Sequence, residues 1–235
     1  MSSTTIPLAP DVPSSTASAT PSSAAKAALQ QIEHAKRHAA IRAVADYFDP
    51  HYHYIGIGSG TTIQYVVDAI KERIDPSLPH TMLFVPTGYQ SRTEIESRGL
   101  IALPFDSLPE DAMLDVAFDG ADEVDEELNC VKGGGACLFQ EKLVAMKARR
   151  FVCVADYRKD VPRLLTDWSY IPIEVAPIAV KPVLRALRAL GSPNPELRVL
   201  NQAKTGPLKT DQDNYIVKAP FPPLLMQRDL SLIHI

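Results

Sequence analysis

The chain has 235 residues, 46% of them hydrophobic and 22% charged, with a formal net charge of −4. It can form one large domain or two small ones with a proper core, and its composition is that of an ordinary globular protein. No polybasic cluster and no apolar run of about 18 residues occurs, which argues against a nucleic-acid partner and a membrane span. The three cysteines, Cys130, Cys137 and Cys153, have no CxxC spacing, which argues against a disulfide framework or zinc site.

Residues 1–24 consist mainly of Ser, Thr, Pro and Ala, and we expect them to form a disordered tail. The segment has no arginine and contains Asp11, unlike a mitochondrial presequence, and no apolar core follows a basic start. With the sparse cysteines, this predicts a cytoplasmic protein.

Residues 25–48 have the apolar spacing of a helix, which Asp49-Pro50 ends. The residues that carry this spacing are Leu29, Ile32, Ala35, Ala39, Ile41, Val44 and Phe48.

From residue 54 to residue 166, short apolar runs alternate with helical segments. The first unit, "YIGIGSGTTIQYVVDAIKERI", predicts a strand, a glycine-rich turn and an amphipathic helix. This alternation predicts a Rossmann-like, mainly parallel sheet in an α/β domain of residues 25–166. Ligands of such sheets bind outside the carboxyl ends of the strands, where the chemically interesting residues of this sequence occur.

Residues 167–220 follow a different order, which predicts strand, helix, strand and strand. A ferredoxin-like unit would need one more helix and one more strand, so we expect an incomplete ferredoxin-like α+β domain. Residues 221–235 are apolar without a pattern and are predicted to form an atypical tail.

The stretch "GIGSGTT", residues 56–62, places glycines where a strand passes into a helix. The unpaired N–H groups and positive dipole of a helix N-terminus suit a phosphate, and Ser59, Thr61 and Thr62 add hydroxyl groups. The stretch matches neither GxGxxG nor GxxxxGK[ST], and a tight structural turn is an equal alternative.

Two carboxylates, Asp119 and Asp122, share the loop "DGADEVD". They can hold sugar hydroxyls and relay protons, or they can coordinate a divalent ion. The other acids of this stretch are predicted to be solvated surface: Glu123, Asp125, Glu126 and Glu127.

In "KGGGACLFQEKLVA", Lys132 precedes three glycines and Glu141 follows, about two turns into the predicted helix. Glycines at a helix N-terminus form an anion nest, and the lysine adds a positive charge that stabilises an oxyanion. Such a lysine beside a carboxylate suits proton abstraction next to a carbonyl. The alternative for Glu141 is an ordinary surface glutamate paired with a lysine.

Together, "GIGSGTT", "VPTGYQS", "DGADEVD", "KGGGACLFQEKLVA" and "VCVADYRK" resemble the A-type ribose-5-phosphate isomerase family, over about residues 30–220. The resemblance implies interconversion of ribose 5-phosphate and ribulose 5-phosphate through an enediol(ate), without metal or other cofactor. It also implies a small sugar-phosphate partner and homo-oligomers in complete family members.

The resemblance also assigns residue roles. Glu141 would shuttle a proton between C1 and C2, Lys132 would stabilise the enediolate oxygen, and Asp119 and Asp122 would hold hydroxyls. Lys36 or Arg37 would touch the phosphate. The implied substrate-binding positions are Ser59, Gly60, Thr61, Thr62, Gly120, Ala121, Gly133, Gly134, Gly135 and Lys159.

The sequence departs from the family at Ser59, where threonine is common, and at Gly88, where serine is frequent. Family members also continue past "TDQDNYIV" with a helix and strands, so the resemblance implies a C-terminally truncated chain. Such a chain would be less stable and more aggregation-prone than a complete homologue.

Other functions remain open from sequence alone. A non-catalytic sugar-phosphate-binding protein, or an inactive fragment of the isomerase, would bind without turnover. An acyl- or CoA-transferase-like protein would need a larger acceptor domain. A divalent-metal phosphohydrolase using Asp119 and Asp122 would lose activity in EDTA.

Overall fold

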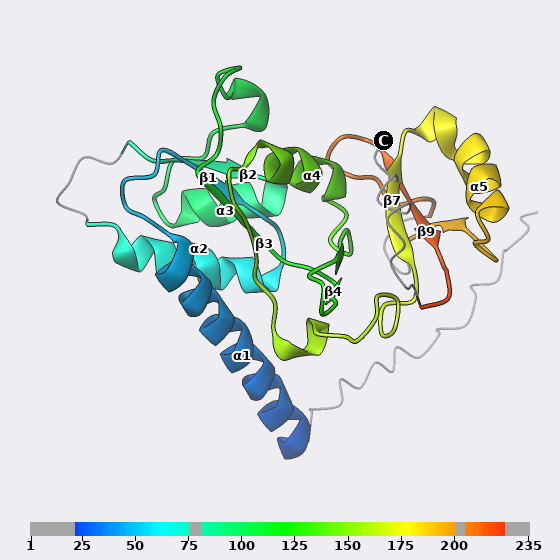
Figure 1. Ribbon diagram of the computed structural model, residues 1–235, viewed down its shortest axis with the longest axis horizontal. Coiled ribbons are helices and arrows are strands. Elements are labelled where there is room, and N and C mark those ends of the chain that lie inside the picture. The colour runs from blue at the N-terminus through cyan, green and yellow to red at the C-terminus, as the bar shows by residue number, and fades with distance from the viewer. Residues whose placement is uncertain (1–21, 76–80, 201–204, 224–235) are drawn as a thin grey trace, which may run out of the picture.

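The computed structural model describes residues 22–75, 81–200 and 205–223, which form a larger α/β unit and a smaller antiparallel unit (Figure 1). None of the helices in these ranges is long and apolar enough to cross a membrane. The larger unit contains α1 (Ser23–Tyr47), β1 (Tyr54–Ile57), α2 (Thr61–Arg73), β2 (Leu83–Pro86), α3 (Tyr89–Ser97), β3 (Val116–Asp119), β4 (Glu123–Val124), β5 (Cys130–Val131), α4 (Leu138–Lys147) and β6 (Phe151–Cys153).

The central sheet has the strand order β2-β1-β3-β6, and all three pairings are parallel. Alternate residues of each strand face opposite helical layers. Ile55 of β1 and Phe118 of β3 pack against α1 and α2, whereas Ala117 packs against Val144 of α4. Because both faces are covered, the strands consist almost entirely of buried apolar residues, as parallel sheets require. The predicted Rossmann-like, mainly parallel sheet is confirmed.

The helix predicted over residues 25–48 is present, and it buries a narrow side of small residues and one lysine. It begins at Ser23, with the Ser22 side chain accepting from the Ala25 N–H, while residues 1–21 lie outside the described part. Its buried side is formed by Lys36, Ala40, Ala43 and Val44, where it packs on α2. Leu29 and Ile41, two of the residues that carry the helical spacing, are 60% and 49% exposed and lie outside this buried side. The N-terminal part of α1 extends beyond the rest of the fold and contacts no sheet (Figure 1).

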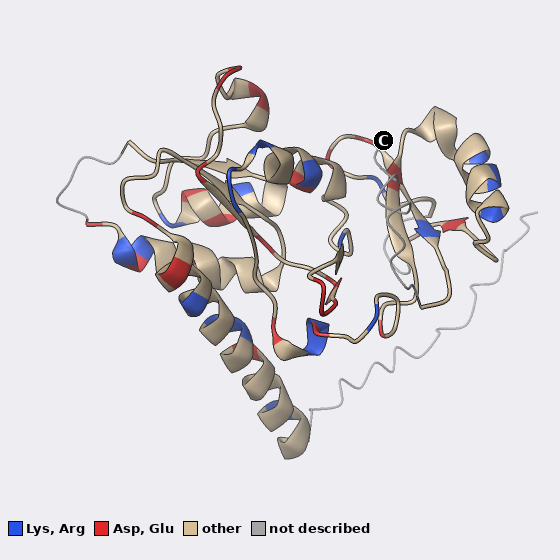
Figure 2. Ribbon diagram, viewed as in Figure 1, with Lys and Arg blue, Asp and Glu red and all other residues tan. Residues whose placement is uncertain are grey.

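The smaller unit follows the predicted order of strand, helix, strand and strand. It contains β7 (Ile171–Val175), α5 (Val180–Ala189), β8 (Glu196–Leu197) and β9 (Tyr215–Ala219), and its antiparallel sheet has the order β7-β9-β8. Leu187 of α5 is buried against this sheet. The Lys and Arg residues of α5 gather on the side facing away from it (Figure 2). Of the predicted tail 221–235, residues 224–235 lie outside the described residues.

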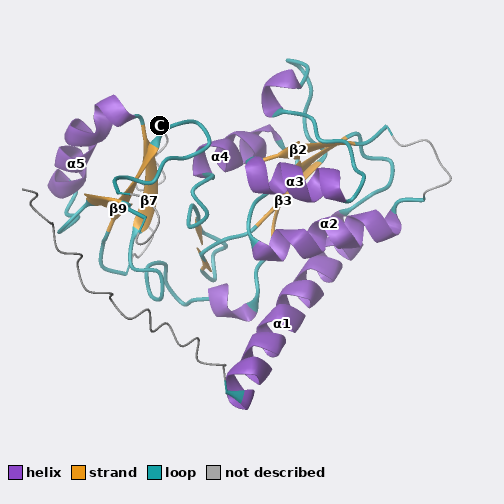
Figure 3. Cartoon of the chain, turned by 180° about the vertical axis from the view of Figure 1, so that it is seen from behind, coloured by secondary structure: helices purple, strands orange, loops and turns teal. Residues whose placement is uncertain are grey.

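The two units meet at the N-termini of α3 and α4, and α4 lies between the parallel sheet and the small unit (Figure 3). Neither helix has a side-chain cap of its own. Carboxylates of the small unit supply one instead: Asp211 Oδ2 accepts from the Tyr89 N–H at 2.8 Å, and Glu174 Oε2 accepts from the Phe139 N–H at 3.0 Å. Negative charge is favourable at a helix N-terminus, so these contacts fix α3 and α4 against the small sheet.

We expect Glu174→Ala to lower the free energy of unfolding by about 1–2 kcal/mol, because α4 loses its cap. Thr210 and Asn214, which both donate to Glu174 Oε1, also lose their acceptor. Glu196→Ala is the control, since among the described residues the Glu196 side chain pairs with Lys218 alone, at the surface, and its loss should stay below about 0.5 kcal/mol. Urea unfolding measures both variants, and equal losses would contradict the capping role.

Candidate active site

The first and third strands of the sheet bring two predicted motifs together. β1 leads into the glycine-rich turn, and β3 ends at Asp119. Gly58 tolerates no side chain here, because a Cβ would lie 1.9 Å from Asp119 Oδ1. The missing Cβ therefore lets the Asp119 carboxylate lie directly against the turn.

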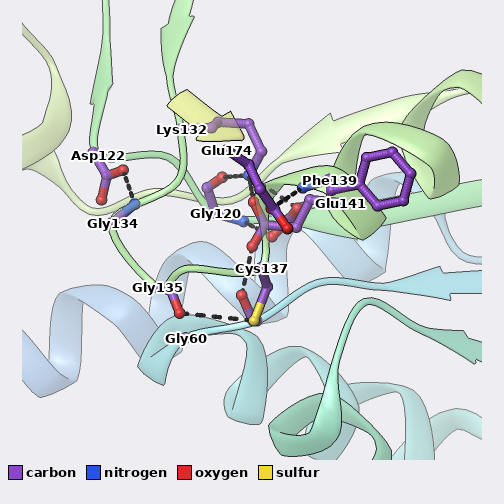
Figure 4. Close-up of polar contacts among 12 residues, drawn as sticks. Gly60, Gly120, Asp122, Lys132, Gly134, Gly135, Cys137, Phe139, Glu141 and Glu174 are labelled. Carbon is purple, nitrogen blue, oxygen red and sulfur yellow. Dashed lines mark hydrogen bonds and ion pairs between the residues drawn. The ribbon is translucent and has the colours of Figure 1, made fainter. Parts of the chain in front are cut away.

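Lys132, at the end of β5, connects the two central carboxylates (Figure 4). Its Nζ lies 2.9 Å from Asp119 Oδ2 and 3.2 Å from Glu141 Oε2, and it donates to the Gly120 carbonyl at 2.6 Å. The side chains of Asp119 and Glu141 are only 4% and 5% exposed. Carboxylates this deeply buried need a partner charge, and one ammonium serves both.

Burial shifts the titration of this group. It raises the pKa of Asp119 to about 6, against the lowering effect of the Lys132 ammonium, and the Glu141 charge raises it further. Burial also lowers the pKa of Lys132, but the two carboxylates outweigh it and raise that pKa above its ordinary value. Lys132 is therefore a permanent cation at neutral pH.

Glu141 lies in the first turn of α4 rather than about two turns into it, because the helix begins only at Leu138. Its burial also rules out an ordinary surface glutamate. Ser59 Oγ donates to Oε1 at 2.5 Å, whereas Oε2 accepts no hydrogen bond from any described residue and has only the Lys132 ion pair. Oε1 is therefore fixed by Ser59, whereas Oε2 can accept a proton from a substrate.

Asp122 is bound by the glycine turn that follows Lys132. The Gly134 N–H donates to Asp122 Oδ2 at 2.7 Å, and a Cβ at Gly134 would lie 2.4 Å from Oδ1. This N–H of the predicted anion nest is thus occupied by a protein carboxylate. Burial raises the pKa of Asp122, while the Gly134 hydrogen bond and the charge of Lys159 oppose that rise.

The remaining predicted contacts lie in the segments that follow β1, β3, β5 and β6. A Cβ at Gly135 would lie 3.4 Å from Ser59 Oγ, so the two glycine-rich turns face each other. Gly60 is the N-cap residue of α2, and Lys159 lies in the short helix Tyr157–Lys159 that follows β6. The other predicted positions occupy the start of α2, the β3–β4 link and the β5–α4 link: Thr61, Thr62, Gly120, Ala121 and Gly133.

The structure distinguishes between Lys36 and Arg37, the two candidate phosphate contacts on α1. Lys36 is buried, and its Nζ donates to Thr61 Oγ1 at 2.9 Å and to Glu33 Oε1 at 2.7 Å. Arg37 is exposed, with its guanidinium 5.2 Å from the centre of the Tyr65 ring. Of these two residues, Lys36 is therefore the one that brings positive charge to the N-terminus of α2.

Sequence reasoning missed the role of Glu123, which was predicted to be solvated surface. That prediction is wrong: Glu123 is 1% exposed, and its carboxylate accepts N–H groups from Leu165, Asp167 and Trp168. Its partners lie more than 40 residues away, so no local pattern could reveal the contact. Glu126 and Glu127 are exposed, as predicted.

Arg198 is a second residue that the sequence did not single out. Its guanidinium donates to the Gly134 carbonyl at 2.7 Å, from the small unit to the glycine turn. Among the described residues, no group of His, Cys, Asp and Glu side chains could hold a metal ion. Asp119, one of the two candidate metal ligands, is instead paired with Lys132.

Proton transfer on an anionic substrate is the chemistry that these contacts favour, and comparison with known proteins agrees. The family pattern described as ribose 5-phosphate isomerase A (phosphoriboisomerase A) matches residues 83–234. The ribose-5-phosphate isomerase of Mycosarcoma maydis is 47% identical over 212 residues, covering 90% of this chain and 72% of that protein. That of Schizosaccharomyces pombe is 45% identical over 196 residues, covering 82% and 69%.

Solved structures agree with the sequence relatives. Ribose 5-phosphate isomerase A from Methanocaldococcus jannaschii superposes with a TM-score of 0.74 at 31% identity, covering 84% of each chain. A D-ribose-5-phosphate isomerase in complex with phospho-erythronic acid gives 0.74 at 34% identity, covering 85% of this chain and 83% of that one. The chain belongs to the ribose 5-phosphate isomerase A family.

Titration of Asp119 tests the charge balance. We expect its carboxyl carbon to titrate near pH 6 by NMR, and Lys132→Met to raise this pKa further because the opposing ammonium is lost. An aspartate in the unfolded chain has a pKa of about 3.9. Between about pH 4 and pH 6, Asp119 is therefore protonated in the folded state and ionised in the unfolded state. Ionisation of Asp119 therefore lowers stability as pH rises from about 4 to 6. A lower Asp119 pKa in Lys132→Met would contradict this balance.

Proposed function

We propose that this chain interconverts ribose 5-phosphate and ribulose 5-phosphate with Glu141 as the base. Membership of the isomerase family supports the reaction. The observation that carries the assignment to Glu141 is its buried carboxylate, with Oε1 held by Ser59 and Oε2 beside Lys132 without a hydrogen bond among the described residues.

In this mechanism Glu141 Oε2 removes the proton from C2 of the open-chain aldose. The C–H electron pair forms the C1–C2 double bond, and the carbonyl electrons move onto O1. Lys132 stabilises the resulting enediolate. A proton then moves from O2 to O1, and Glu141 returns its proton to C1 as the C2 carbonyl forms. Atoms and charge balance without an external reactant.

The phosphate is assigned to the start of α2. Thr61 and Thr62 open this helix, and the buried Lys36 ammonium, which donates to Thr61 Oγ1, supplies the positive charge. The solved relative bound to phospho-erythronic acid supports a phosphorylated ligand of this size. Asp122, Lys159 and the links at Gly120–Ala121 and Gly133–Gly135 then hold the sugar hydroxyls. Binding energy at the phosphate orients the reacting carbons.

Three coarser features complete the proposal. Residues 25–166 form the catalytic domain and residues 167–220 the small domain, with the caps at α3 and α4 joining them. Homo-oligomers are expected of complete members of the family. The chain works in the cytoplasm, consistent with three free cysteines.

Turnover of ribose 5-phosphate in EDTA tests the function directly. We expect activity in the wild-type chain and a loss of about 10²–10⁴-fold in Glu141→Gln, because the proton acceptor is removed. Glu126→Gln, an exposed change, serves as the control and should keep full activity. Activity that requires a divalent ion and releases inorganic phosphate would point to a phosphohydrolase. Substrate binding without turnover in the wild-type chain would point to a sugar-phosphate-binding protein.

The phosphate assignment gives a separate prediction. Lys36→Met should raise KM for ribose 5-phosphate by about tenfold or more, since a charged hydrogen bond contributes about 1.5–3 kcal/mol. Arg37→Met removes the same charge one residue further along and should change KM less than about twofold. Steady-state kinetics compares the two variants. Equal effects on KM would contradict the assignment to Lys36.

A further inference from the structure

We propose that Glu123 is a positioning residue of this site, acting through Trp168. This proposal depends on the proposed function only for the experiment that measures turnover. Glu123 directly follows Asp122 and opens β4, but its carboxylate points to the segment 165–168 that leads into the small unit. It therefore ties the loop of Asp122 to a segment more than 40 residues later in the chain.

The hydrogen bonds of Glu123 are all to backbone. Oε1 accepts from the N–H groups of Asp167 and Trp168, each at 2.6 Å, and Oε2 accepts from the N–H of Leu165. A buried carboxylate that gathers three N–H groups fixes the path of that backbone. Leu165 has φ +63, a left-handed conformation that is unfavourable for a leucine. Its hydrogen bond to Glu123 holds it there.

The segment that Glu123 holds places the Trp168 ring against the site. A Cβ at Gly134 would lie 2.9 Å from Trp168 Cη2, so the ring edge rests on the glycine whose N–H binds Asp122. The Lys159 ammonium lies 5.8 Å from the centre of the same ring, within cation–π range. Trp168 thus contacts two groups of the proposed substrate-binding site, Gly134 and Lys159.

Among the described residues, the Glu123 side chain forms no hydrogen bond or ion pair with the Asp119–Lys132–Glu141 group or with the start of α2. Apart from its peptide bond to Asp122, its influence passes through Trp168 to Lys159 and to Gly134, whose N–H binds Asp122. Loss of Glu123 should therefore weaken substrate binding more than proton transfer.

The chain contains a single tryptophan, so its fluorescence reports on Trp168 alone. Glu123→Gln keeps the size of the side chain but turns an NH₂ group toward at least one backbone N–H. We expect native far-UV circular dichroism with a red-shifted Trp168 emission that acrylamide quenches more strongly. Glu126→Gln, three residues along and exposed, should leave the emission unchanged.

Kinetics of ribose 5-phosphate isomerisation give the second readout. We expect Glu123→Gln to raise KM about five- to tenfold while kcat falls less than about threefold. If Glu123 acts through Trp168, then Trp168→Ala raises KM similarly, and Glu123→Gln adds nothing further in that background. Additive effects on KM, or an unchanged KM in Trp168→Ala, would overturn the proposal.

Two outcomes separate this proposal from the proposed function. If the wild-type chain shows no turnover, the proposed function fails, and the emission of Glu123→Gln alone decides: an unchanged emission and quenching overturn the positioning role. If Glu123→Gln does not fold, Trp168→Ala still decides through its KM in the wild-type background.

Discussion

The ion pairs that Lys132 makes with Asp119 and Glu141 are the constraint on which the rest of the site depends. Two carboxylates from β3 and α4 are buried together, and without a cation each would be costly. The end of β5 must therefore place the Lys132 ammonium between the two carboxylates. Gly58 must also lack a side chain, because a Cβ there would clash with the Asp119 carboxylate. The same cation that makes this burial possible would stabilise the enediolate, so fold stability and chemistry depend on one side chain.

A second device recurs around this centre: a carboxylate that accepts main-chain N–H groups from a distant segment. Asp122 binds the glycine turn, Glu123 binds the segment before the small unit, and Glu174 and Asp211 cap helices that lack caps of their own. Charge-assisted bonds of this kind are stronger than neutral ones and specify geometry. These hydrogen bonds fix the positions of the loops between the two units. The same loops contain most of the residues proposed to contact the substrate.

Local pattern was enough to predict the parallel sheet, the strand–helix–strand–strand order of the small unit and the grouping of the chemical residues at strand ends. It failed where burial depends on distant partners. Glu123 lies in an acidic run that looks solvated, and only the segment 165–168 buries it. Leu29 and Ile41 have helical spacing, but α2 covers only another side of α1. Glu141 was expected two turns into α4 because three glycines gave no signal that the helix starts as late as Leu138.

The most direct test of the central claim is a double-mutant cycle on kcat with Lys132→Met, Glu141→Gln and the double variant. If the ammonium and the carboxylate act as one unit on the enediolate, the double variant is about as slow as the slower single variant. If the two losses multiply instead, Lys132 and Glu141 contribute independently, and the shared site described for them is contradicted.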